Sequence, residues 1–209
     1  MKYPRIPHLP GSKGAEDDVF AKFPPTLRSF RVYEKLDGAN AGIIVDEQGI
    51  RVRGRSEDMR PHPQWDALKN WTYNKYQPLR TLREDNEFES VIIYGEWLSA
   101  KHTIYYDRLP DFFIVYDILA DGTWLPQHEV AEVAQAHGLT ISPCIYETDD
   151  VETAILNLLE RHVPLYGDRY EGFIFRADSD IREVYKYVRH DFELGNEHWF
   201  DKPVERNKL

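Results

Sequence analysis

The sequence has almost no cysteine. Cys144 is the single one, which rules out a disulfide framework within the chain and any zinc site built from several cysteines. No apolar run approaches the roughly 18 residues that a membrane-spanning helix requires, and the first residues lack the apolar core of a signal peptide. These absences exclude disulfide-stapled, zinc-finger and membrane-spanning classes, and we expect a cytoplasmic protein.

Basic residues are in deficit as well. The 209 residues include 36 Asp and Glu but only 26 Lys and Arg, so the net charge is -10. This balance argues against a surface coated with positive charge, although a local positive groove can still bind nucleic acid on an acidic protein. The hydrophobic fraction of 42% is typical of a folded globular chain, and the length suits a single domain spanning residues 1–209.

Glycine-rich phosphate loops are missing too. The sequence contains neither a Walker-type Gly-Lys-Ser/Thr loop nor the Gly-x-Gly-x-x-Gly fingerprint of dinucleotide-binding folds. A nucleotide bound by this chain must therefore be held in another way.

The apolar pattern predicts a mixture of strands and helices after an N-terminal arm. The arm, residues 1–29, contains five prolines and two glycines and is expected to lack regular structure. Its Arg5, His8 and Lys13 are interpreted as ordinary solvated charges, with a phosphate contact as the alternative. Strands are predicted over 30–35, 41–45, 50–53, 91–98, 111–119, 140–146, 170–176 and 183–189, helices over 61–82, 126–138 and 149–164, and a polar tail over 190–209.

Several ionisable residues lie on or beside strand segments that are otherwise apolar. They are Lys35, Arg55, Glu96, Glu171 and Lys186. Because buried charge is costly unless it is paired or bound, this set suits a site that handles a polyanion with a divalent metal. Carboxylates hold the ion, cations neutralise phosphate oxygens, and a lysine with a lowered pKa attacks. Tyr116, also on a strand, offers a platform for a nucleobase.

These charged residues also have plain structural interpretations. Lys35 fits a solvated strand end before a turn, and Glu96 fits one half of a structural salt bridge. Arg51, Arg53 and Arg55 share one strand face, which suits either solvent exposure or contact with phosphate or ribose.

Five short motifs occur in a recognisable order. They are Lys35-Leu36-Asp37-Gly38, Tyr94-Gly95-Glu96, Phe113-Ile114-Val115-Tyr116-Asp117, Glu171-Gly172-Phe173-Ile174-Phe175-Arg176 and Val184-Tyr185-Lys186. This series resembles motifs I, III, IIIa, IV and V of the covalent nucleotidyltransferases, the superfamily of polynucleotide ligases and capping enzymes. Glu34-Lys35-x-x-Gly38-x-Asn40 and Gly54-Arg55-Ser56 make the chain most similar to the RNA ligase 2-type ATP-dependent RNA ligases, here as a minimal catalytic domain.

The resemblance implies a fold and a reaction. The fold is α+β: a single nucleotidyltransferase domain, ATP-grasp-like, of twisted and mainly antiparallel sheets flanked by helices. In the reaction, Lys35 attacks the α-phosphate of ATP, releases pyrophosphate and becomes a lysyl-adenylate. The AMP then passes to an RNA 5′-phosphate, and a 3′-hydroxyl displaces it to seal the phosphodiester. Mg²⁺ or Mn²⁺ is the implied metal, and RNA repair is the implied setting.

The same resemblance assigns roles in catalysis and metal binding. Glu171 is the main metal-associated carboxylate, with Glu96 and Asp37 beside it. Lys186 contacts the nucleotide and, with the metal, lowers the pKa of Lys35. Asp37 also shapes the turn that follows the nucleophile.

The implied nucleotide contacts come from several motifs. Tyr116 stacks on adenine, and Glu96 and Arg55 contact the ribose or orient each other. Glu34 is also expected to contact the nucleotide, and Asn40 to help hold the nucleotide or the water molecules bound to the metal.

Two features depart from the family pattern. Val188 occupies the position at which motif V usually offers a second lysine, and Arg189 faces the other side of a regular strand. About 20 residues follow motif V, so we expect RNA to be held by the catalytic domain, the arm, or an end-processing or RNA-binding partner protein. Two other interpretations stay open: a DNA nick ligase or capping-type nucleotidyltransferase, and a nucleotide- or RNA-binding module that has lost catalysis.

Overall fold

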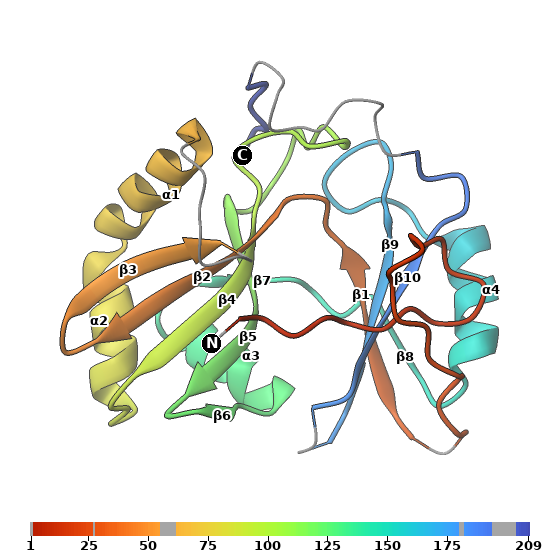
Figure 1. Ribbon diagram of the computed structural model, residues 1–209, viewed down its shortest axis with the longest axis horizontal. Coiled ribbons are helices and arrows are strands. Elements are labelled where there is room, and N and C mark those ends of the chain that lie inside the picture. The colour runs from red at the N-terminus through yellow and green to blue at the C-terminus, as the bar shows by residue number, and fades with distance from the viewer. Residues whose placement is uncertain (1, 27, 55–61, 180–181, 194–203) are drawn as a thin grey trace.

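Two β-sheets face each other across the centre of the molecule (Figure 1). The computed structural model describes residues 2–26, 28–54, 62–179, 182–193 and 204–209. Among these residues every strand pairing except that of β5 with β7 is antiparallel, and helices lie on the outer sides of the sheets. This is the α+β arrangement of mainly antiparallel sheets that the sequence predicts.

The larger sheet contains six strands in the order β3-β2-β4-β5-β6, with β7 beside β5. The bounds are β2 Ala39–Asp46, β3 Gly49–Gly54, β4 Val91–Trp97, β5 Phe113–Ala120, β6 Thr123–Trp124 and β7 Thr140–Ile141. The register of β4 against β5 shifts between Tyr94 and Gly95, directly before Glu96. Such irregularities re-aim the side chains that follow them, and here the side chain that follows is a predicted site residue.

Three helices cover the outer face of the larger sheet: α1 Pro63–Asn74, α2 Tyr76–Asp85 and α3 Gln127–Ala136. Ala41 and Ile43 of β2 pack in one hydrophobic core with Leu68 of α1, Leu79 of α2 and Val130 of α3. Because side chains alternate along a strand, the intervening residues of β2 point to the inner side, toward the smaller sheet.

The prediction of one helical stretch over 61–82 is wrong. The chain forms two helices that break at Lys75, where φ is -100° and ψ is 16°. Pro78 explains the break, because a proline inside a continuous helix lacks the N–H that bonds the carbonyl four residues earlier and clashes with that carbonyl, which belongs to Asn74. In the first turn of α2 neither problem arises. The predicted start at Pro61 lies outside the described residues.

The smaller sheet has the order β10-β9-β1-β8. Its strands are β1 Phe30–Lys35, β8 Tyr146–Thr148, β9 Gly172–Ala177 and β10 Val184–Val188, and helix α4, Val151–Arg161, packs on the outer face. The predicted helix start is confirmed, since the Asp150 side chain accepts a hydrogen bond from the Thr153 N–H. None of the described helices has the length and apolar character needed to cross a membrane.

The N-terminal arm runs from the larger sheet to the edge of the smaller one (Figure 1, red). As predicted, it forms no helix or regular strand within its described residues. It is nevertheless tied down: Lys186 of β10 donates its N–H to Pro7 O at 3.0 Å and accepts from Leu9 N at 2.8 Å. His8, between them, is only 2% exposed, so the prediction that it is an ordinary solvated charge is wrong. Arg5, by contrast, pairs with Asp17 in solvent.

A buried carboxylate joins the two sheets. Asp117 of β5 accepts hydrogen bonds from Arg176 of β9 at 2.9 Å, from Arg182 at 3.1 Å and from the Tyr3 hydroxyl of the arm at 2.5 Å. The Asp117 and Arg176 side chains are 4% and 7% exposed, so solvent screens their attraction little and either charge is costly alone. This cluster fixes the sheets relative to each other and anchors the start of the arm.

We predict that Asp117→Asn lowers the free energy of unfolding by about 3–5 kcal/mol, because it leaves the Arg176 charge buried without its counterion. Urea denaturation followed by circular dichroism measures the change. Asp46→Asn is the matched control, since its partner Arg51 is 42% exposed, and this variant should lose less than about 1 kcal/mol. Equal losses in the two variants would contradict the role assigned to Asp117.

Candidate active site

A pocket of about 1080 Å³ lies between the two sheets. The smaller sheet contributes Lys35 and Lys186, the larger sheet contributes Glu96 and Tyr116, and the arm contributes Tyr3. A volume of this size accommodates a nucleotide. The pocket therefore gathers onto one surface the charged side chains of Lys35, Glu96 and Lys186, which lie in three separate segments of the sequence.

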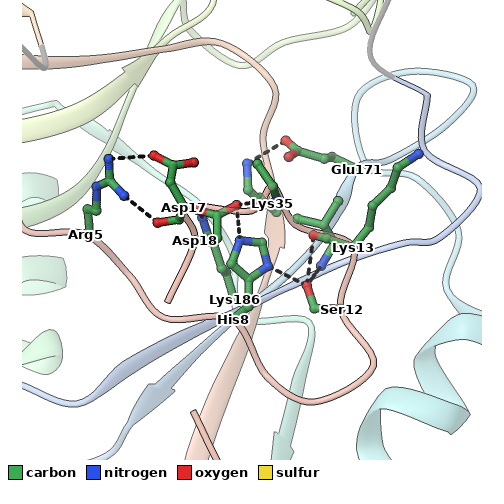
Figure 2. A network of polar contacts seen from close by, with 11 residues as sticks. Arg5, His8, Ser12, Lys13, Asp17, Asp18, Lys35, Glu171 and Lys186 are labelled. Carbon is green, nitrogen blue, oxygen red and sulfur yellow. Dashed lines mark hydrogen bonds and ion pairs between the residues drawn. The ribbon is translucent and has the colours of Figure 1, made fainter. Parts of the chain in front are cut away.

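Lys35 and Glu171 meet because of strand pairing. Lys35 ends β1, Glu171 directly precedes β9, and the antiparallel register sets Lys35 opposite Gly172. The Lys35 Nζ donates to Glu171 Oε2 at 2.5 Å, although the residues are 136 positions apart (Figure 2). Gly172 permits the close approach of β9 to β10, since a Cβ atom there would lie 1.9 Å from the carbonyl oxygen of Tyr187.

Asp37 shapes the turn after Lys35, as predicted. Its Oδ2 accepts the N–H groups of Thr103 at 2.7 Å and Ile104 at 2.8 Å, and its own N–H donates to the Tyr106 hydroxyl at 2.8 Å. The next residue, Gly38, donates its N–H to Glu96 Oε1 at 3.1 Å. The turn is thus locked to the loop after β4 and also orients one of the site carboxylates.

Asn207, which the sequence places in a polar tail, supports that loop from behind. Its side chain is buried, accepts the Tyr106 N–H at 2.9 Å and donates to the Leu98 carbonyl at 2.8 Å. Sequence reasoning missed this residue, because a single asparagine near polar residues carries no periodicity or motif. Asn207 supports the turn after Lys35 indirectly, through Tyr106 and Asp37.

The charges around Lys35 are strongly coupled. Burial lowers the pKa of Lys35, but the carboxylates of Glu171, Glu96 and Asp37 outweigh it and raise that pKa above its ordinary value. The lowering expected from Lys186 is therefore overcome by these carboxylates. Burial likewise raises the pKa of Glu171, and burial with the neighbouring carboxylates raises the pKa of Glu96 to about 8. Lys35 is therefore protonated at neutral pH, and any role as a nucleophile requires that it first lose a proton.

The predicted metal ligands lie in this cluster without forming a complete cage. Among the described residues no group of three or more His, Cys, Asp or Glu side chains is arranged to hold a metal ion. One carboxylate oxygen of Asp37, Oδ2, already accepts hydrogen bonds from two backbone N–H groups. Glu171 and Glu96, both with raised pKa values, remain suited to a cation that is brought with substrate phosphates, the usual manner of Mg²⁺. The metal assignment stays a prediction.

Asn40 and Tyr116 form the opposite wall. The Asn40 Nδ2 donates to the Tyr116 hydroxyl, and both residues line the pocket. The other atom of that amide, Oδ1, is buried and has no hydrogen-bond partner among the described residues. Buried acceptors are normally satisfied, so this oxygen indicates a donor supplied by a ligand.

Two predicted nucleotide contacts differ from the rest: Glu34 lines the pocket but its carboxylate points away from it, and Arg55 lies outside the described residues. The Glu34 carboxylate shares the α4 side of β1 with Phe30 and Val32, where it accepts from His162 Nε2 and Leu165 N at 2.7 and 2.9 Å. Because Lys35 follows it in the strand, the two side chains point to opposite faces.

Other residues of the pocket carried no usable sequence signal. Tyr3 packs edge-on against the Tyr116 ring with centroids 5.2 Å apart, and Asp18 lies 3.6 Å from the Lys186 ammonium. Ser142, in the connection between β7 and β8, lines the pocket. The sequence of the arm predicts an irregular, polar segment, and it shows no periodicity that would indicate which side chains turn inward.

The sequence from β1 to the end of β10 matches a known family. Residues 28–188 match the family described as RNA ligase, and the arm lies outside the match. No curated protein sequence matches the chain.

Solved structures show the same fold at low identity. A ligand-free variant of the RNA ligase of Naegleria gruberi superposes with a TM-score of 0.55 at 18% identity, over 78% of this chain and 50% of that one. A variant of that ligase with ATP and Mn gives 0.54 at 18%, over 79% and 51%. An archaeal ATP-dependent RNA ligase gives 0.60 at 15%, over 77% and 42%. The α+β nucleotidyltransferase fold is thus confirmed, and the chain spans about half the length of these ligases or less.

The raised pKa of Glu96 predicts an unusual stability profile. In the unfolded chain this carboxyl ionises near 4.5, whereas in the folded protein it keeps its proton up to about 8. The folded state binds the extra proton, so Glu96 makes the free energy of unfolding fall as pH rises through this interval. Glu96→Gln should therefore be more stable than the wild type at pH 8 by a few kcal/mol, with a smaller difference at pH 5.

Urea denaturation at pH 5 and pH 8 measures this difference. Glu132→Gln, a substitution at an exposed position of α3, is the matched control and should show none. A Glu96→Gln effect that is equal at the two pH values would contradict the proposed protonation.

Proposed function

The chain belongs to the RNA ligase family, and we propose that it is an ATP-dependent RNA ligase in which Lys35 carries AMP as a covalent lysyl-adenylate. The observation that supports this most directly is the 2.5 Å contact between Glu171 Oε2 and the Nζ of Lys35, which lines a nucleotide-sized pocket. The pocket wall thus carries a potential nucleophile, bonded to a proton acceptor, and the cation Lys186. The structural role of a solvated strand end does not require such a setting.

In the proposed first step the neutral Lys35 amine attacks the α-phosphorus of ATP. A P–N bond forms, the bond to the bridging oxygen breaks, and pyrophosphate leaves. The ammonium first has to lose a proton, and Glu171 is its hydrogen-bond acceptor. Because burial raises the pKa of Glu171, this carboxylate takes a proton more readily than an exposed one.

Charge on the phosphates has to be balanced in this step. Lys186 lines the pocket and supplies one cation. A divalent ion bound with ATP would supply further positive charge, held by Glu171 and Glu96 together with phosphate oxygens and water. Lys186 would thus neutralise phosphate charge directly, whereas the two carboxylates would act by holding the metal ion.

The nucleoside is proposed to lie along the wall formed by Asn40 and Tyr116. The Tyr116 ring offers its face to adenine, and its tilt is supported by Tyr3 and by the hydrogen bond from Asn40. The unpartnered Asn40 Oδ1 accepts a hydrogen bond from the nucleotide. Glu96 takes a ribose contact, whereas the Glu34 carboxylate is turned to the opposite face of β1, where its Oε2 bonds His162 and Leu165.

Two transfers complete the proposed reaction. An oxygen of the RNA 5′-phosphate attacks the phosphorus of the lysyl-adenylate, the P–N bond breaks, and Lys35 regains a proton. A 3′-hydroxyl then attacks the activated 5′-phosphate, AMP leaves, and a phosphodiester forms. RNA is the proposed polymer because of the family to which residues 28–188 belong.

We predict that incubation with ATP labelled at the α-phosphate and Mg²⁺ or Mn²⁺ labels the wild-type protein. The label should survive denaturing electrophoresis, resist alkali and be released by acid, as a phosphoramidate is. Lys35→Ala should abolish it, because the attacking nitrogen is lost. Lys69→Ala is the matched control, since Lys69 is an exposed lysine paired with Asp66, and it should label normally. Absence of label from both ATP and GTP would favour a binding module without catalysis.

Sealing assays distinguish the polymer. We predict that the protein joins a 5′-phosphorylated RNA strand to an RNA 3′-hydroxyl at least about tenfold faster than the DNA strands of the same sequence. The measurement is the rate of product formation on denaturing gels, with nicked duplexes and free single strands compared side by side. A preference for nicked DNA would favour the DNA ligase alternative, and transfer from GTP to a 5′-diphosphate end would favour the capping alternative.

A further inference from the structure

The arm is the part of the chain that family membership does not explain, because the family match begins at residue 28. Yet the arm is bonded to the backbone of Lys186 in β10: Pro7 O accepts the Lys186 N–H, and the Leu9 N–H donates to Lys186 O. Farther along the arm, the Ser12 hydroxyl accepts the Val188 N–H at 2.8 Å. The arm thus behaves as an added edge of the smaller sheet, centred on Lys186.

One carboxylate of the arm faces the Lys186 ammonium. Asp18 Oδ1 lies 3.6 Å from Lys186 Nζ, and their side chains are 26% and 20% exposed (Figure 2). The other oxygen, Oδ2, accepts the Ala15 N–H at 2.9 Å and lies 3.1 Å from His8 Nε2. Asp18 is therefore held in place by the arm itself, and it presents its remaining oxygen to the lysine.

His8 lies between Ser12 and Asp18. Its Nδ1 is 2.7 Å from Ser12 Oγ, which also accepts the Val188 N–H and lies 3.3 Å from the Lys13 carbonyl oxygen. Its Nε2 lies 3.1 Å from Asp18 Oδ2. Burial and the nearby Lys186 charge lower the pKa of His8, which favours the neutral ring. Stacking on Phe20, with centroids 5.1 Å apart, fixes the plane of the ring.

These contacts form a closed circuit that starts and ends on β10. It runs from Val188 through Ser12 and His8 to Asp18 and returns at Lys186 (Figure 2). A flexible lysine side chain loses most of its freedom when such a rigid carboxylate holds it. An ammonium group carries three protons and can bond more than one acceptor at a time.

We propose that Asp18, held by the Ala15 N–H and flanked by His8, is a positioning residue that fixes the Lys186 ammonium where a nucleotide phosphate meets it. This inference rests on the proposed adenylylation of Lys35. The arm thereby becomes part of the catalytic apparatus, acting through Lys186 and without touching the reacting atoms. Orientation of a catalytic group of this kind is worth up to about a hundredfold in rate when it is lost.

The test is single-turnover formation of the Lys35 adenylate by Asp18→Asn, together with its reversal by added pyrophosphate. We expect the rate constant at saturating ATP to fall by about tenfold or more in both directions. The ATP concentration for half-saturation should not rise, because the substitution removes a negative charge near the phosphate site. Loss of rate without loss of affinity separates positioning from a general weakening of the site.

Asp17→Asn is the matched control. Asp17 is the neighbouring residue, pairs with Arg5 and is 73% exposed (Figure 2), and its substitution should leave both rate constants unchanged. An equal loss in Asp17→Asn would overturn the proposal. An unchanged rate with a lower half-saturating ATP concentration in Asp18→Asn would also overturn it, since Asp18 would then act only as a competitor of phosphate.

A second measurement does not depend on adenylylation. Acylation of Lys186 by a water-soluble ester, followed by mass spectrometry, should be about threefold faster or more in Asp18→Asn, because the adjacent carboxylate stabilises the unreactive ammonium. Asp17→Asn should react as the wild type does. Unchanged Lys186 reactivity in Asp18→Asn would refute the contact, whereas faster acylation together with no label on wild-type Lys35 would refute only the proposed adenylylation.

Discussion

The buried ion pair between Asp117 and Arg176 is the constraint on which the site depends. Both partners are close to the pocket: Asp117 follows Tyr116 in β5, and Arg176 of β9 itself lines the pocket. A pocket between two sheets keeps its width only if the sheets cannot slide. The ion pair sets that width, and because it lies in low dielectric it tolerates little displacement.

The site itself is assembled at a cost to stability. Three carboxylates, from Glu171, Glu96 and Asp37, crowd one ammonium in a buried space, and the pKa of Glu96 rises to about 8 as a result. A hydrophobic core would not select such a group of side chains, because neutral residues of similar size would pack there more favourably. This electrostatic cost is expected of a functional site, where a polyanionic substrate and its cation would pair with the same charged groups.

The sequence predicted the fold and the members of the pocket better than their mutual orientation. Lys35, Glu96, Tyr116 and Lys186 lie around one pocket as expected, because each occupies a strand position whose facing follows from simple alternation. Glu34 shows the limit of the family resemblance, since the same alternation turns its side chain away from Lys35.

The remaining errors have two different physical origins, one local and one long-range. The break at Lys75 depends on the local effect of one proline, and the burial of His8 depends on a contact with β10 nearly the whole chain away. Long-range pairing of an irregular segment leaves no period in the sequence, so neither the arm's docking nor the inward turn of Asp18 was predictable from pattern.

The hydrogen bond between Ser12 and Val188 spans 176 positions of the chain. During synthesis the arm therefore leaves the ribosome long before its partner strand exists, and the wall that holds Lys186 closes only after β10 has been made. Contacts of such high sequence separation form late, because the closure entropy of the intervening chain must be met first. A nascent chain accordingly carries Lys35 and Glu96 before the wall of the pocket that contains Lys186 has formed.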